Sequence, residues 1–132
     1  IEVNAKWVAG GTQGTRIQGN HIGTTADGQQ AIWNRYGIIV SAHVDSDADT
    51  HEIVDLVIGG TQPGEGNLIS GNGDNGIVII AASSNFVRGN VIGLNAAQTA
   101  VLGNATQGIW IGSASRVEVM IVSRRSSSAS GR

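Results

Sequence analysis

The sequence has no cysteine, one proline and few aromatic residues. The absence of cysteine among 132 residues excludes disulfides and thiolate metal sites. Aromatic residues make up 4% of the chain and hydrophobic residues 40%, so an ordered core has to be built from Ile, Val, Leu and Ala. The 20 glycines beside 1 proline are typical of many tight turns between short strands, and not of collagen or a proline-rich linker.

Neither charge nor hydropathy indicates a nucleic acid or a membrane as partner. The formal net charge is −2, without the basic patch that nucleic-acid binding requires. No apolar run approaches the roughly 18 residues of a membrane-spanning helix. We therefore expect one domain with its own core, no nucleic-acid partner and no membrane span.

Two stretches of the chain are copies of one another. Residues 16–26 read RIQGNHIGTTA and residues 86–96 read FVRGNVIGLNA, with ISGN at 69–72 as a partial third copy. The alignment assigns one repeat position to Asn20, Asn72 and Asn90, and another to Asn34 and Asn104. Asparagine tolerates sharp left-handed corners and can bond to the same residue in a neighbouring copy. These residues are therefore predicted to be stacked corners and not catalytic groups.

A second motif, Gly-Ile-x-Ile or a close variant, opens at Gly37, Gly76 and Gly108. Such short β-branched runs predict strands. No segment has an apolar stripe of helical period over ten or more residues, so little or no helix is expected. Similar strands that recur without helices between them favour a solenoid, in which each coil stacks on a copy of itself.

The segments IGGTQPGEGNLISGNGDNGIVI, FVRGNVIG and LGNATQGIWIG together resemble the right-handed parallel β-helix repeats of many bacterial extracellular proteins. They are similar in shape to pectate lyases and in pattern to periplasmic copper-maturation β-helix proteins. The resemblance covers about residues 8–115. It implies an all-β, right-handed, single-stranded parallel β-helix of about four coils, at a bacterial cell surface or secreted. It implies no activity, since such folds host lyases, hydrolases, epimerases and adhesins.

The domain is expected to span residues 1–122, with bulged loops near 41–56 and 94–107 and a disordered polar tail at 123–132. Open coil ends expose unpaired backbone edges, which invite pairing. No capping helix is apparent. We therefore expect a dimer formed through an exposed sheet face or the open ends, or a fragment of a longer surface protein.

Alternation along each Gly-Ile-x-Ile strand directs the outer residues inward and the middle residue outward. The predicted core positions are Ile38, Val40, Ile77, Ile79, Ile109 and Ile111, joined by Ile17, Ile22, Ile69, Val87 and Ile92. The middle residues Ile39, Val78 and Trp110 are all apolar and would form one outward column. Either a bulged loop covers this column, or it is an interface for self-association or ligand contact.

One stretch, residues 41–55, breaks the repeat and concentrates charge. Its acidic and imidazole side chains fall at every second position and would share one face of an extended segment: His43, Asp45, Asp47, Asp49 and His51. Carboxylates suit calcium, and His with Asp suits zinc. The group is thus a candidate divalent-cation site, and no other cofactor is expected. The competing interpretation is a solvated acidic loop.

The same stretch contains Asp49-Thr50-His51-Glu52, which resembles the Asp-Pro-His-Glu element of β-helical alginate epimerases. The resemblance implies that Asp49 and His51 are an acid/base pair acting at C5 of a uronate. The sequence departs from that element, because Thr50 replaces the proline and no Tyr-Gly directly precedes it.

Two functional hypotheses follow. The first is a non-catalytic module that contacts a partner or a carbohydrate through its sheet faces, because the repeat is regular and no complete acid/base set accompanies it. The alternative is a polysaccharide-acting enzyme, a uronate epimerase or lyase, that uses residues 43–52. The sequence favours the non-catalytic module.

Overall fold

The protein folds into three parallel β-sheets. The computed structural model describes residues 1–4, 12–42, 53–113 and 115–120. Within these ranges every regular element is a strand, which confirms the predicted all-β fold. Sheet A contains β1 (Glu2–Asn4), β5 (Ile38–Ser41), β9 (Ile77–Ile80) and β12 (Ile109–Gly112).

The other two sheets are built in the same way. Sheet B contains β2 (Thr12–Gln13), β3 (Arg16–Ile17), β6 (Ile53–Val54), β7 (Val57–Gly59), β10 (Ser83–Arg88) and β13 (Ser115–Met120). Sheet C contains β4 (His21–Ile22), β8 (Leu68–Ile69) and β11 (Val91–Ile92). All strand pairings are parallel.

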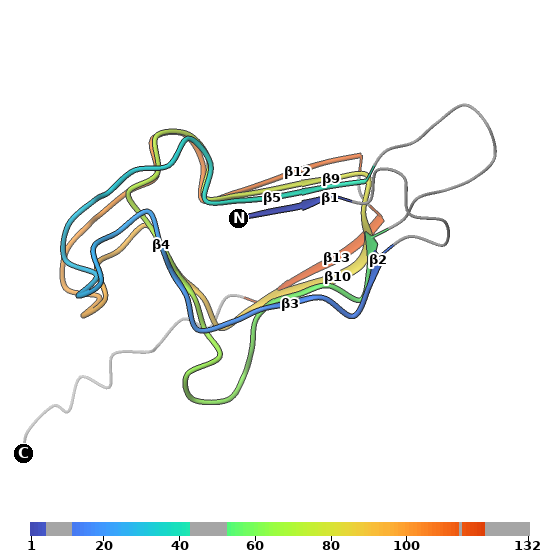
Figure 1. Ribbon diagram of the computed structural model, residues 1–132, viewed down its shortest axis with the longest axis horizontal. Coiled ribbons are helices and arrows are strands. Elements are labelled where there is room, and N and C mark those ends of the chain that lie inside the picture. Colours follow the sequence, from blue (N-terminus) through green and yellow to red (C-terminus); the bar gives the residue numbers. More distant parts are fainter. Residues whose placement is uncertain (5–11, 43–52, 114, 121–132) are drawn as a thin grey trace, which may run out of the picture.

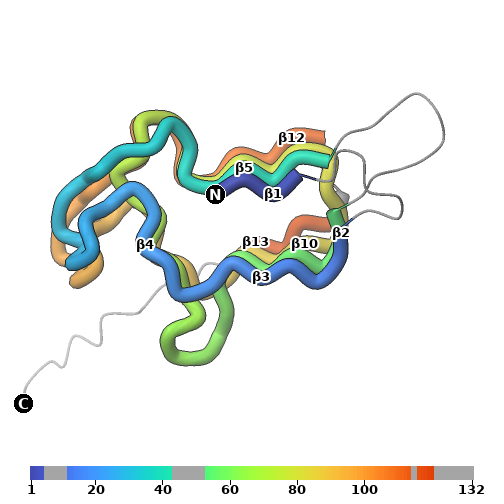
Figure 2. Tube along the Cα trace, in the orientation of Figure 1, coloured from blue at the N-terminus to red at the C-terminus, as the bar shows by residue number. Residues whose placement is uncertain are grey.

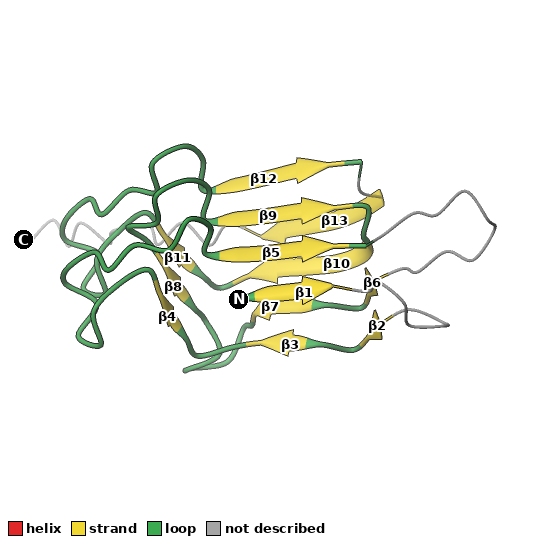
Figure 3. Ribbon diagram, turned by 45° about the horizontal axis from the view of Figure 1, so that its top comes forward, coloured by secondary structure: helices red, strands yellow, loops and turns green. Residues whose placement is uncertain are grey.

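The chain visits sheets A, B and C in turn and then returns to sheet A. We call one such passage a circuit. Successive circuits follow nearly the same path (Figures 1 and 2), and their strands lie side by side in each sheet (Figure 3). The first three circuits supply a strand to every sheet, whereas β12 and β13 extend only sheets A and B.

The predicted alignment of the Gly-Ile-x-Ile motifs is confirmed. Ile38 pairs with Ile77, and Ile77 with Ile109, in adjacent strands of sheet A. Alternation then directs the following residues of each strand to opposite faces, as expected for extended backbone.

The predicted alignment of the asparagines was wrong in one circuit. Ile69 pairs with Ile22 and Ile92 of sheet C, and not with Ile17. The residue stacked between Asn20 and Asn90 is consequently Asn67. The Gly71-Asn72 pair comes five residues later in the circuit than Gly66-Asn67, and its resemblance to the other Gly-Asn pairs is misleading.

Two ladders of asparagines connect the circuits, one on each side of sheet C, and the middle member of each, Asn67 or Asn72, is buried. In the first ladder, Asn20 donates from Nδ2 to Asn67 Oδ1 (3.0 Å), and Asn67 donates to Asn90 Oδ1 (2.9 Å). In the second, Asn34 donates to Asn72 (3.2 Å), which donates to Asn104 (2.8 Å). The corner residues therefore satisfy one another, as buried polar groups must.

Four ladder amides also bond to backbone carbonyls of the preceding circuit, namely those of Asn67, Asn72, Asn90 and Asn104. Asn67 Nδ2 donates to the carbonyl of Ile17 (2.8 Å), and Asn67 Oδ1 accepts the N–H of Asn20 (3.0 Å). Asn104 Nδ2 similarly donates to the carbonyl of Ile69 (3.1 Å). The side chains thus replace the strand pairing that is interrupted where the chain turns between sheets.

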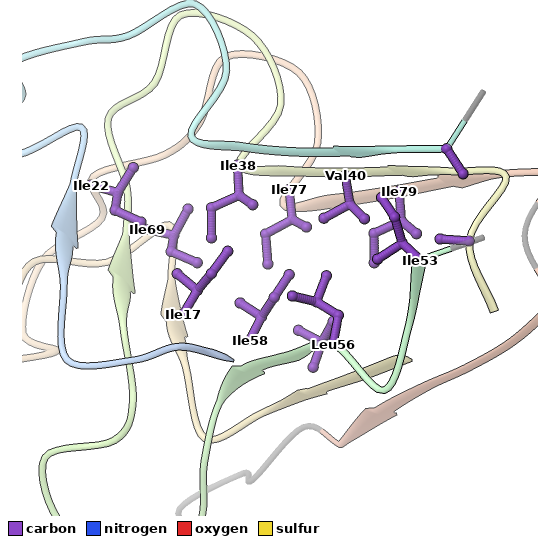
Figure 4. Packing of buried hydrophobic residues seen from close by; sticks show 13 residues of the cluster. Ile17, Ile22, Ile38, Val40, Ile53, Leu56, Ile58, Ile69, Ile77 and Ile79 are labelled. Atoms are coloured by element: carbon purple, nitrogen blue, oxygen red, sulfur yellow. The ribbon is translucent and has the colours of Figure 1, made fainter. Parts of the chain in front are cut away.

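The core is a column of aliphatic side chains enclosed by the three sheets (Figure 4). Its fully buried members come from adjacent circuits and include Ile38, Ile77, Ile58 and Ile69. The inward position predicted for Ile111 corresponds to a side chain that is 42% exposed. That core assignment was wrong, because β12 is the last described strand of sheet A and no circuit of the described residues covers it.

Sheet B bends where one residue of each circuit adopts the left-handed conformation. In register these residues are Gly14, Asp55, Ser84 and Arg116, with φ of 68°, 55°, 54° and 53°. Only the first is glycine, so the sequence gives little sign of this corner.

The first and third circuits each carry an arm between sheets C and A. The first arm comprises residues 23–33 and the second arm residues 93–103, and each is closed by an antiparallel bridge, Thr24 with Ala31 and Leu94 with Val101. The second arm lies within the bulge predicted near 94–107. Of the bulge predicted near 41–56, residues 43–52 lie outside the described residues, and Ile53–Val54 form β6.

Replacing Asn67 by alanine should lower the free energy of unfolding by about 2–4 kcal/mol, because several buried or partly buried partners lose their hydrogen bonds together. Urea denaturation would measure the change. The control is Asn34→Ala, since Asn34 is exposed and donates only one ladder bond (3.2 Å). We expect its cost to be below about 1 kcal/mol. Equal costs for the two substitutions would contradict the role assigned to the ladder.

Candidate ligand groove on sheet A

The outer face of sheet A carries an apolar column across its strands. The strand register places Ile39 beside Val78 and Val78 beside Trp110. Val78 is only 6% exposed because its two neighbours cover it, whereas Trp110 on the last strand is 42% exposed. The structure thus brings together the three residues predicted to form this column.

The column forms the floor of an open hollow of about 470 Å³. Tyr36 and Trp110 contribute aromatic rings to its lining, and Ile80 extends the aliphatic floor. Its polar lining residues are Asn75, Thr106 and Gln107. The size lies within the range of about 300–1,000 Å³ that is typical of ligand sites.

The position of the Trp110 indole depends on Gly112. The two residues lie two positions apart in β12 and therefore on the same face. A Cβ atom added at Gly112 would lie 2.5 Å from Cη2 of Trp110. The ring therefore lies along its strand, over the glycine, and any larger residue there would displace it.

Tyr36 stands at the turn that leads into β5. The Arg35 guanidinium lies over its ring, 5.1 Å from the centroid. Such a cation–π contact favours a fixed ring orientation at a modest energy. Tyr36 therefore brings an oriented aromatic ring, with a positive charge beside it, to the lining of the groove before β5.

Hydrogen bonds between adjacent circuits hold the polar side of the groove. Thr106 Oγ1 donates to the carboxylate of Asp74 (2.7 Å), and the N–H of Gln107 donates to Asn75 Oδ1 (3.2 Å). Asn75 Nδ2 donates in turn to Asp74 (3.2 Å). In the described part of the chain nothing bonds to the side-chain amide of Gln107, which is exposed. The groove therefore presents a neutral donor and acceptor beside its apolar floor.

Three of the lining residues had a sequence signal that was not used. Tyr36, Asn75 and Gln107 each directly precede the glycine of a Gly-Ile-x-Ile motif. They therefore occupy equivalent corners of successive circuits and gather at one end of the column. Reading the position before each glycine would have found them together.

The predicted acidic and imidazole group lies elsewhere in the chain. His43, Asp45, Asp47, Asp49 and His51 all fall outside the described residues. Within residues 1–4, 12–42, 53–113 and 115–120, no three His, Asp or Glu side chains gather as a metal site would require. The cation site and the Asp49 and His51 acid/base pair stay predictions.

Comparisons with protein-family models, curated proteins and solved structures found no match to this chain. Across the described residues there is also no helix with the length and hydropathy to cross a membrane. The interpretation of the groove consequently rests on its own geometry.

Gly112→Ala should move the Trp110 indole without unfolding the protein, since the added methyl group meets only the far end of that ring. We expect the indole N–H resonance of Trp110, identified from a Trp110→Phe spectrum, to shift. The control is Gly103→Ala, because a Cβ atom at Gly103 meets nothing within 4 Å. An indole resonance that is the same in both variants would contradict this packing.

Proposed function

We propose that this protein is a non-catalytic glycan-binding module and that the sheet A groove is its binding surface. We further infer that the three sheets are the faces of a right-handed parallel β-helix. The cyclic order of the sheets supports this inference, as does the parallel register of every strand pair.

The observation that carries the proposal is the combination of aromatic rings, an aliphatic floor and amide groups in one open hollow. A sugar ring has apolar C–H faces and hydroxyl groups around its edge. Tyr36 and Trp110 can contact the faces, while Asn75 and Gln107 can bond to the hydroxyls. None of the described residues that line the hollow is charged, which favours neutral hydroxyl groups as the bonded part of the ligand.

The shape of the groove favours contact with a chain and not the enclosure of one sugar. Its floor is the outer surface of three adjacent strands, β5, β9 and β12, and it is open to solvent along that surface. An open site buries little of a ligand, so the affinity should be modest, with a Kd on the order of 1 mM for a short oligosaccharide. A polysaccharide at a bacterial cell surface would present many such segments at once.

The experiment is a titration of the labelled full chain, followed by NMR, with oligosaccharides of cellulose, xylan, alginate and polygalacturonate. We expect resonances of Ile39, Val78 and Trp110 to shift with at least one of them. Trp110→Ala should weaken that binding about tenfold or more, because a buried aromatic contact is worth about 1–3 kcal/mol. Trp33→Ala is the control, since Trp33 is an exposed tryptophan outside the groove lining.

Three results would overturn the proposal. One is the absence of binding to every glycan tested. Another is binding that Trp110→Ala leaves unchanged. The third is a dimer, detected by sedimentation without glycan, that Trp110→Glu dissociates, because the groove would then be a self-association surface. Uronate turnover that is lost in His51→Ala would favour the enzymatic alternative instead.

A further inference from the structure

Among the described residues, sheet C ends one strand earlier than its neighbours at the C-terminal end of the stack. Sheets A and B continue to β12 and β13, while the last described strand of sheet C is β11. The two longer sheets therefore stand as walls on either side of β11. The space between them is a hollow of about 550 Å³, which we call the trough.

The trough exposes residues that other circuits bury. Ile22 and Ile69, the counterparts of Ile92 in sheet C, are buried, whereas Ile92 is only half-buried. On the walls, Ile111 and Met120 are 42% and 44% exposed. The lining is mainly aliphatic, as is expected of a core position that lacks its next layer.

The backbone edge of β11 shows which groups a further strand would use. In sheet C, each strand accepts from the next one: the carbonyls of Asn20 and Ile22 accept the N–H groups of Leu68 and Ser70 at 2.8 and 3.1 Å. By the same register, the carbonyls of Asn90 and Ile92 are the acceptors for a strand placed on β11. No N–H of the described residues donates to either of these carbonyls.

The first asparagine ladder also stops at the trough. Asn20 and Asn67 each donate their backbone N–H to Oδ1 of the next ladder asparagine, both at 3.0 Å. Asn90 has no such acceptor among the described residues. Met120 pairs in register with Arg88. In the sequence Arg88 is followed by Gly89 and Asn90, whereas Met120 is followed by Ile121 and Val122. These two positions therefore lack the Gly-Asn pair that enters sheet C in the three earlier circuits.

We propose that the trough binds one extended peptide strand of another polypeptide. The strand lies parallel to β11 and carries an asparagine beside Asn90 and an aliphatic residue two positions later, above Ile92. Its asparagine Oδ1 accepts the N–H of Asn90, and its aliphatic side chain fills the space between Ile109 and Val119. This is recognition by strand addition, in which backbone bonds supply affinity and alternate side chains supply specificity.

The proposal does not depend on glycan binding by the groove, which lies on the outer face of sheet A. The probe is a blocked synthetic peptide with the sequence VRGNVIGL, a copy of residues 87–94. Titrated into the labelled full chain, it should shift the resonances of Asn90, Ile92, Ile109 and Met120 and leave that of Tyr36, which precedes β5, unchanged.

Two peptide variants test the recognition elements. Replacing the peptide's asparagine by alanine removes the ladder acceptor, and replacing its isoleucine by aspartate puts a charge into the aliphatic space. Each should weaken binding about tenfold or more. In the protein, Met120→Glu should do the same, whereas Val101→Glu should not, because Val101 is 84% exposed and does not line the trough.

Several outcomes would overturn the proposal. These are the absence of shifts at β11 up to the solubility limit of the peptide, shifts at His21 and Ile22 on the opposite edge of sheet C, and equal binding of the alanine peptide. A trough already filled by this chain's own residues 121–132 would give the first of these outcomes.

Discussion

The rest of the structure depends on how the backbone polar groups are satisfied at the corners between sheets. Strand pairing stops at each corner, and a buried N–H or carbonyl left without a partner costs about 1–3 kcal/mol. The ladder asparagines meet this requirement because one amide can bond at once to the asparagine of the next circuit and to a backbone carbonyl of the preceding circuit. They fix which residues of successive circuits lie at the same position, and so they determine the columns of the core and of the groove.

The second circuit shows what this constraint allows. It passes from sheet C to the second ladder without an arm, since Asn72 follows Ile69 closely. The arms of the first and third circuits meet beside it: the N–H of Ala96 donates to the Gly28 carbonyl (3.0 Å), and Asn95 donates to Gln29 (3.0 Å). A Cβ atom at Gly28 would lie 2.5 Å from that of Ala96, so the close approach requires glycine. Loops of unequal length are tolerated as long as the ladder positions are kept.

How far the sequence predicts this structure depends on whether a motif marks a position uniquely. The Gly-Ile-x-Ile runs do so, and their alignment gave the sheet A register and the column Ile39, Val78, Trp110. The Gly-Asn pairs do not, because the second circuit contains two of them, and only the hydrogen bonds distinguish Asn67 from Asn72.

Other features left weaker traces in the sequence. The left-handed corner of sheet B is occupied by four different residue types, so no single residue type reveals it. The exposure of Ile111 follows from its place on the last strand of a sheet, which no local pattern encodes. The aromatic and amide residues of the groove were identifiable only through their shared position before each glycine.

The groove and the trough lie on opposite faces of the same strand. In β12, Trp110 faces the groove, while Ile109 and Ile111 face the trough. The equivalent residues of β9, Ile77 and Ile79, are fully buried because β12 covers them, whereas the two isoleucines of β12 have no such cover among the described residues. Filling the trough would bury these two isoleucines and so favour the ordered state of β12. Because Trp110 is held against Gly112 of that strand, the aromatic side of the groove depends on the order of β12. A strand bound in the trough would thus stabilise the geometry that we assign to glycan binding, although it contacts none of the groove's side chains.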